Sequence, residues 1–430
     1  MPFRAGLVTG QYANKNECRV HGDFLKPEKR TIAHAFNHAG YRTSWVGKWH
    51  LSGGLSAFGW NDGADFWVHP YLRGGFQDWF GFELSNHFYN TRYSHQEDCW
   101  PPLELKGYQT DALTNLSLKY LKDKAEKLDS PWFHCISYEA PHTGNDGTGR
   151  ECNPAPPEYE ARFHAEDLIM RDNVPEGTIT EAREQQAGYY AQIANLDDNI
   201  GRLLEYLDES GQADNTLVLF FSDHGELGGS HGLFHKQEVY DESIHIPMIM
   251  RLPGIIPQGK TVETPFSGVD IYPTCAHFCD ISIPDKVQGI SFAEFLKGNM
   301  QHVPREQLLI QWLGKARYGF SDFKYRAIRN KRYTYSVCDM PVRCVLFDNQ
   351  SDPLQMNNLY GKPEHRILQE RLHQSLLNEI IDSGESIPGF IQRSTIPQVN
   401  RSTIKHKTSK QRNLETVSQI KKQAIPGGKT

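Results

Sequence analysis

Helix and strand patterns alternate along the first two thirds of this 430-residue chain, and this alternation constrains its fold most. A helical pattern followed by a strand pattern occurs three times, at residues 31–39 and 41–46, 111–128 and 132–138, and 185–207 and 216–222. The first helical pattern stops at Gly40, a residue that commonly ends helices. Such alternation predicts an α/β sandwich, in which helices flank a large, mostly parallel central sheet.

The pattern changes after residue 304. Short strand-like runs separated by turns occur at residues 308–312, 325–329, 332–337 and 345–348, and a helical pattern follows at 365–381. This order is typical of a small antiparallel sheet with one packed helix. We therefore predict a main α/β domain in residues 1–304, a small C-terminal α+β subdomain in 305–390 and a tail in 391–430.

Charge divides the chain unevenly. Residues 391–430 hold nine Lys and Arg and one acid, a charge of +8; because the whole chain has −6, the first 390 residues carry −14. An acidic body argues against nucleic acid as the main partner. The tail is rich in Ser, Thr, Gln and Lys, which favours a flexible extension over a binding arm. No apolar run approaches the roughly 18 residues of a membrane span.

The compartment stays open on the sequence alone. Eight cysteines are scattered without a CxxC pair, and Cys338 and Cys344 could bridge a hairpin or remain thiols. The first seven residues resemble the inside of a domain more than a signal peptide, so we expect a segment upstream of Met1. A signal in that segment would make the protein periplasmic, secreted or lysosome-like.

The sharpest local feature is a strand pattern that runs directly into polar residues. Residues 216–222 are followed by Asp223, His224 and Gly225. In open α/β sheets ligands bind at the carboxyl ends of strands, and a carboxylate beside an imidazole can ligate one cation. The structural alternative is an ordinary loop with a helix cap.

Other strand patterns end in the same way. Lys48 and His50 follow the strand at 41–46, and their spacing in an extended backbone would place both on one face. His142 follows the strand at 132–138, and Lys236 follows the Asp223 motif. Cations and imidazoles suit anion binding and proton transfer. Taken singly, each could instead be a solvated lysine or a structural histidine.

The order of these motifs resembles the sulfatase family of the alkaline-phosphatase superfamily. The matching segments are Pro2–Gly10, Gly40–Leu51, Pro141-His142, Ser222–Gly225, Lys236, Ile246–Gly254 and Asp348–Leu359. They cover about residues 2–360, and the set is highly specific. Phe3 departs from the usual Ser or Ala, and Cys18 lacks the spacing of the signature. The signature therefore places its Cys or Ser nucleophile one position before Met1, which makes the chain look truncated just after it.

The resemblance implies a mechanism. The Cys or Ser would be matured to formylglycine by dedicated machinery, and its hydrate would attack sulfur. Arg4 would orient and polarise this hydrate, and His50 would serve its proton transfers. Lys48 would bind sulfate oxygens, while His142 and Lys236 would hold or protonate the leaving oxygen. The 430 residues alone are expected to be inactive, because the attacking atom belongs to a residue that precedes them.

The resemblance also implies a cation. Asp223 and His224 would ligate one divalent ion, usually Ca²⁺, together with upstream carboxylates. An imidazole ligand makes Mn²⁺ more plausible, and Mg²⁺ is also open.

The implied substrates are sulfate monoesters of carbohydrates or aryl groups. Residues 67–93 are dense in aromatics and would line the substrate mouth, although core packing explains many of them equally well. Two alternatives remain: a phosphonate monoester or phosphodiester hydrolase of the same superfamily, and a non-catalytic protein that binds sulfated glycans.

Overall fold

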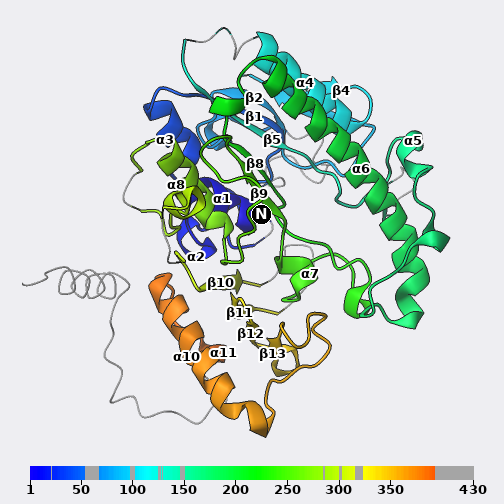
Figure 1. Ribbon diagram of the computed structural model, residues 1–430, viewed down its shortest axis with the longest axis vertical. Coiled ribbons are helices and arrows are strands. Elements are labelled where there is room, and N and C mark those ends of the chain that lie inside the picture. Colours follow the sequence, from blue (N-terminus) through cyan, green and yellow to red (C-terminus); the bar gives the residue numbers. More distant parts are fainter. Residues whose placement is uncertain are drawn as a thin grey trace, which may run out of the picture.

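A central sheet carries the first part of the chain (Figure 1). The computed structural model describes residues 1–20, 22–53, 67–96, 102–123, 127, 129–145, 151–283, 286–299, 303–314 and 323–392. The sheet has the order β4-β3-β2-β1-β5. Its strands are β1 (Arg42–Lys48), β2 (Asp78–Phe82), β3 (Thr91–His95), β4 (Leu103–Leu105) and β5 (Trp132–Ser137). β1 runs parallel to β2 and β5, whereas β3 and β4 are antiparallel additions at one edge.

Helices cover both faces of this sheet. Trp45 of β1 belongs to the core cluster that includes residues of α1 (Pro2–Thr9), α3 (Ile32–His38) and α8 (Gly268–Phe278). The next residue, Val46, packs with Leu113 of α4 (Gln109–Asp123) on the other face, and α6 (Ile179–Glu209) contacts α4. Successive strand residues point to opposite faces, so both faces are apolar and both are buried.

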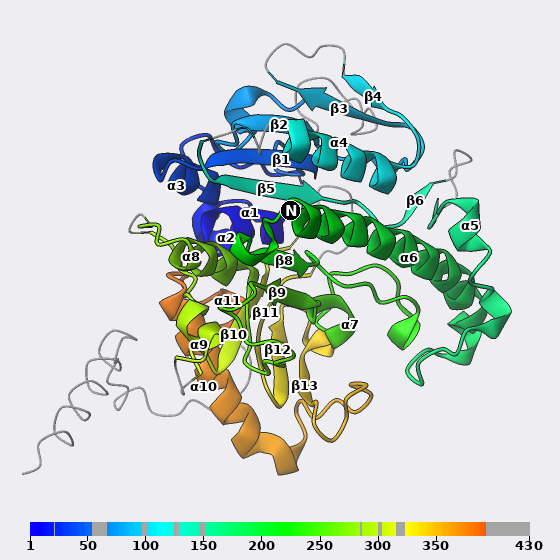
Figure 2. The same cartoon turned by 45° about the horizontal axis from the view of Figure 1, so that its top comes forward.

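A separate pair of strands lies between the central and C-terminal sheets (Figure 2). β8 (Val218–Phe221) pairs with β9 (Met248–Arg251) in antiparallel orientation. The two-residue strands β6 (Gly144–Asn145) and β7 (Glu151–Cys152) form a small hairpin. The remaining short helices of this part are α2 (Ala13–Asn16), α5 (Pro157–Glu160), α7 (Asp241–Ile244) and α9 (Ala293–Lys297).

The C-terminal sheet is antiparallel, as predicted. Its strands are β10 (Gln307–Trp312), β11 (Tyr325–Asn330), β12 (Tyr333–Cys338) and β13 (Val345–Asp348). Ile328, Tyr335, Leu346 and Leu376 are fully buried in its core, the last from α10 (Arg366–Asp382). Helix α11 (Gly389–Gln392) ends the described chain, so most of the predicted tail lies outside the described residues.

The predicted fold class is confirmed: an α/β unit with a mostly parallel central sheet, plus a small antiparallel sheet with one packed helix. The bounds of the predicted strands differ from the observed ones by at most two residues. The strand expected at 216–222, for example, is observed as Val218–Phe221.

The aromatic segment at 67–93 contributes to the core. It contains β2 and part of β3, which the sequence analysis did not predict. Trp79, Phe82 and Phe88 are buried almost completely, so core packing accounts for them. None of the helices in the described ranges, the 31-residue α6 included, has the length and apolarity that a membrane crossing requires.

Candidate active site

Every predicted site residue lines one cavity of about 2180 Å³. Its lining includes Arg4, Lys48, His50, His142, Asp223, His224 and Lys236. The residues come from the start of α1, from the last residue of β1, and from the segments that follow β1, β5 and β8. The cavity therefore lies at the carboxyl ends of these strands, where ligands bind in open α/β folds.

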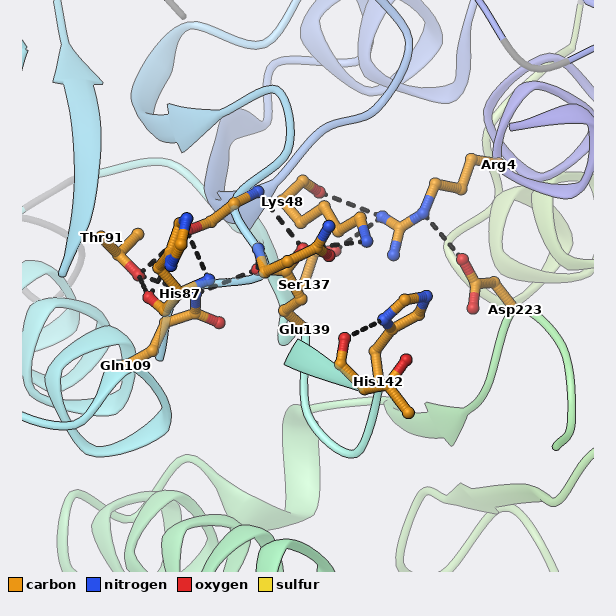
Figure 3. A network of polar contacts seen from close by, with 12 residues as sticks. Arg4, Lys48, His87, Thr91, Gln109, Ser137, Glu139, His142 and Asp223 are labelled. Carbon is orange, nitrogen blue, oxygen red and sulfur yellow. Dashed lines mark hydrogen bonds and ion pairs between the residues drawn. The ribbon is translucent and has the colours of Figure 1, made fainter. Parts of the chain in front are cut away.

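Arg4 lies between Lys48 and Asp223 in the polar network (Figure 3). Pro2 begins α1 with a residue suited to the first turn, and Gly10 ends it with φ of 64°. The Arg4 side chain donates from Nε to Asp223 Oδ2 at 2.8 Å and from Nη1 to Ser137 Oγ at 2.7 Å. Nη1 also donates to the Lys48 carbonyl at 3.0 Å. A planar guanidinium with these acceptors is held in a single orientation.

Lys48 ends β1 and is buried with a carboxylate. Its Nζ lies 3.0 Å from Glu139 Oε1, and the two side chains are 6% and 0% exposed. Gly47 permits the close approach of β1 and β5, because it has φ of 94° and a Cβ there would collide with the Ser137 carbonyl. Lys48 is thus a fixed, buried cation of the cavity.

His50 reaches the cavity by a different route from the one predicted. The expected extended backbone from Lys48 to His50 is wrong, because β1 ends at Lys48 and His50 has φ of 58°. Its backbone N–H donates to the Glu83 carbonyl at 2.9 Å. Both predicted residues nevertheless line the same cavity.

His142 and Lys236 form the third contact pair. His142 Nδ1 lies 2.6 Å from the Thr143 carbonyl, which can only accept, so this nitrogen carries the proton. Nε2 then accepts from Lys236 Nζ at 2.7 Å. Burial, reinforced by the charges of Lys236 and Lys48, lowers the pKa of His142 well below its ordinary value. The imidazole is therefore neutral beside an ammonium group.

Asp223 and His224 turn their remaining acceptor atoms toward each other. Asp223 Oδ2 accepts from Arg4, and His224 Nδ1 donates to the Gly225 carbonyl at 2.8 Å. Asp223 Oδ1 and His224 Nε2 lie 3.6 Å apart. Burial lowers the pKa of His224 to about 4, although Asp223 opposes the shift. Burial alone would raise the pKa of Asp223, but Arg4 and His224 hold it well below its ordinary value.

Two adjacent acceptors without a proton between them fit two ligands of one divalent cation. The described part of the chain contains no group of three or more His, Cys, Asp or Glu residues that could hold a metal ion. Asp223 and His224 thus fit part of a coordination shell, and any further ligands would come from other groups.

Met1 also lines this cavity, together with Arg4.

The comparison with known proteins decides the family. The sulfatase family model matches residues 1–281, well over half of the chain. The chain belongs to the sulfatase family. A second model, the C-terminal region of N-sulphoglucosamine sulphohydrolase, matches residues 229–382 of this sulfatase.

Two relatives extend the match over most of the chain. An ulvan-active sulfatase of Formosa agariphila is 34% identical over 389 residues, which cover 89% of this sulfatase and 72% of the relative. An N-acetylglucosamine-6-O-sulfatase of Bacteroides thetaiotaomicron is 24% identical, with 87% and 76% covered.

Two solved structures share the fold. A sulfatase homologue from Bacteroides fragilis superposes with a TM-score of 0.78 and 24% identity, covering 91% of this chain and 86% of the other. A phosphonate monoester hydrolase of Agrobacterium radiobacter gives 0.68 and 20%, with 89% and 86% covered. At these identities the likeness shows the fold alone.

The sequence analysis assigned no role to Ser137 and Glu139, although both belong to the candidate site. Ser137 accepts from Arg4, and Glu139 pairs with Lys48. A signal existed, since Glu139 is a carboxylate that directly follows a buried strand pattern next to a strand ending in Lys48. Parallel strands bring such ends together at one edge of the sheet.

Proposed function

We propose that this protein hydrolyses sulfate monoesters of a carbohydrate. The observation that carries the proposal is the meeting of Arg4, Lys48 and Lys236 in one cavity with the acceptor pair Asp223 and His224. Family membership supports the reaction class. The names of two relatives, an ulvan-active sulfatase and an N-acetylglucosamine-6-O-sulfatase, support a sugar as the alcohol part.

In this proposal Arg4 orients the nucleophile. The chemistry of attack would be supplied by formylglycine one position before Met1, as the family signature implies. Met1 and Arg4 line the same cavity, which supports this position. The Arg4 guanidinium is already fixed by Asp223 and Ser137, so it can direct positive charge at the attacking oxygen without reorganisation. His50 would accept and return protons at the same oxygen.

Lys48, His142 and Lys236 would bind the sulfate group and the leaving oxygen. Sulfate monoesters gain negative charge on the leaving oxygen as the S–O bond breaks, and fixed cations aimed at it lower the barrier. The contact of 2.7 Å between Lys236 Nζ and His142 Nε2 places an ammonium donor beside a neutral imidazole. Such a pair can move a proton to the departing alcohol.

Asp223 and His224 would hold a divalent cation, Ca²⁺ first, with Mg²⁺ or Mn²⁺ as the other candidates. When bound, the cation would supply positive charge against the sulfate oxygens. The two acceptor atoms 3.6 Å apart support this assignment.

The test is turnover by a longer form with Cys or Ser one position before Met1, expressed with the formylglycine-generating machinery. We expect sulfate release from an aryl sulfate and from sulfated monosaccharides, and none from the 430-residue form. Comparable hydrolysis by both forms would refute the nucleophile position. Binding of sulfated glycans without turnover by the matured form would favour the non-catalytic alternative.

A phosphonate monoester or phosphodiester hydrolase is the second candidate, because a phosphonate monoester hydrolase shares the fold. The same matured protein should be assayed with aryl phosphonate monoesters and aryl phosphodiesters. We expect the larger kcat/KM on the sulfate ester, and the reverse ratio would favour the second candidate.

A further inference from the structure

One short segment contacts all three cations of the candidate site. Ser137 accepts from Arg4 at 2.7 Å, Glu139 pairs with Lys48 at 3.0 Å, and His142 accepts from Lys236 at 2.7 Å. Ser137 is the last residue of β5, so the segment starts from a rigid strand. Of these three partners, only Glu139 is charged.

Glu139 is saturated with hydrogen-bond donors. Oε1 contacts Lys48 Nζ and accepts from the Ser85 backbone N–H at 3.3 Å. Oε2 accepts from the Asn86 backbone N–H and from Gln109 Nε2, each at 3.1 Å. The side chain is 0% exposed. Because protein donors already occupy both carboxylate oxygens, we assign Glu139 a contact with Lys48 and none with the substrate.

The surroundings keep this carboxylate ionised. Burial alone would raise the pKa of Glu139, but the charge of Lys48 and the hydrogen bond from Gln109 outweigh it and lower the pKa. Gln109 begins α4, and its Nε2 also donates to Thr91 Oγ1 at 2.8 Å. Glu139 is therefore fixed independently of Lys48.

A buried negative charge next to a cation that binds an anion needs a reason. The Glu139 charge weakens the attraction between Lys48 and a sulfate. However, an ammonium on a flexible side chain is easily misplaced. A misplacement of about 1 Å can lower the catalytic rate about 10²-fold. An ammonium has three N–H donors, so Lys48 can stay on Glu139 and still contact a sulfate oxygen. Glu139 can thus fix the Lys48 ammonium and still leave N–H donors for a sulfate oxygen.

We propose that Glu139 is a positioning residue for sulfate-ester hydrolysis, which acts by holding the Lys48 ammonium in the cavity. The inference rests on the proposed function. It differs from a purely structural role in one measurable respect: the effect of losing the Glu139 charge depends on the presence of Lys48.

The test is a double-mutant cycle with Glu139→Gln and Lys48→Ala in the matured protein, with kcat and KM for an aryl sulfate as readouts. Glu139→Gln keeps the shape and removes the charge, and we expect kcat/KM to fall about tenfold or more. In the Lys48→Ala background the same change should alter kcat/KM by less than about twofold. An equal loss in both backgrounds would overturn the proposal.

A matched control is Glu385→Gln, because Glu385 is a largely buried carboxylate paired with Arg326 in the C-terminal sheet. We expect it to leave kcat/KM unchanged. If Glu139→Gln does not fold, Gln109→Leu provides the second variant, since it removes one hydrogen bond from Glu139 and retains both charges. We expect Gln109→Leu to lower kcat/KM only when Lys48 is present, and a Lys48-independent loss would overturn the proposal.

The proposed function and the positioning role of Glu139 can be overturned separately. If the unchanged matured protein releases no sulfate from any ester, the proposed function fails. If it releases sulfate and Glu139→Gln retains kcat/KM within twofold, the positioning role alone is overturned.

Discussion

The ion pairs Lys48–Glu139 and Arg4–Asp223 lie in one cavity. They differ in whether a carboxylate oxygen remains available to a ligand. The first pair is 6% and 0% exposed, and both oxygens of Glu139 are occupied. In the second pair Asp223 is 24% exposed and turns Oδ1 toward His224 Nε2. The Lys48–Glu139 pair therefore fixes the Lys48 ammonium, whereas the Arg4–Asp223 pair leaves Asp223 Oδ1 for the proposed metal ion.

The difference suggests how a strongly charged site stays folded. Several buried cations in one cavity are costly unless each has a partner. Lys48 has a complete ionic partner, Lys236 has a neutral imidazole, and Arg4 shares Asp223 with the proposed cation site. We therefore expect a bound metal ion to change the contact between Arg4 and Asp223 and to leave the contact between Lys48 and Glu139 unchanged.

The largest expected effect is on cation binding. Asp223→Ala should abolish Ca²⁺ binding by the extended protein, because it removes the oxygen nearest His224. Isothermal titration calorimetry measures this, and Glu139→Gln serves as the control that retains binding. Tight binding by Asp223→Ala would show that the cation binds elsewhere and that the Arg4–Asp223 pair does not supply a ligand.

The next effect concerns the cations themselves. Lys48→Ala, His142→Ala and Lys236→Ala should each lower kcat/KM by roughly 10²-fold or more, as for other groups that stabilise developing charge. Lys119→Ala, which changes an exposed lysine of α4, should leave it unaltered. A loss below about threefold in all three site variants would mean that sulfate binds outside this cavity.

The fold was largely predictable from residue patterns. The helix and strand patterns that alternate up to Asp223 predicted the layers, because such alternation favours helices packed on a mostly parallel sheet. Strands β2 and β3 escaped prediction because Trp79 and Phe82 lie in an aromatic segment without clear periodicity. The pairing of Trp45 with Trp79 across β1 and β2 and the burial of Trp79 and Phe82 show that this segment belongs to the core.

The candidate site was predictable in its residues but only partly in its geometry. Strand ends indicated Lys48, His142 and Asp223, because parallel strands present their carboxyl ends at one edge. Local spacing could not give the positive φ of His50, which depends on a turn held by Glu83. Nor could it pair Lys48 with Glu139, because the contact joins residues 91 positions apart in sequence.

The smallest expected effect concerns an ion pair outside the site, whose loss should lower stability without changing activity. Glu385→Gln weakens the buried pair with Arg326, so we expect a loss of about 2 kcal/mol in the free energy of unfolding. Urea unfolding measures the loss, and kcat/KM below the transition should not change. A fall in kcat/KM with unchanged stability would show that the C-terminal sheet reaches the active site functionally.

The most direct test is a crystal structure of the extended, matured protein with a sulfated monosaccharide. We expect sulfate oxygens about 3 Å from Lys48 Nζ and Lys236 Nζ, while Lys48 keeps its contact with Glu139. A sulfate group bound outside the cavity that Arg4, Lys48 and Lys236 share would contradict the account.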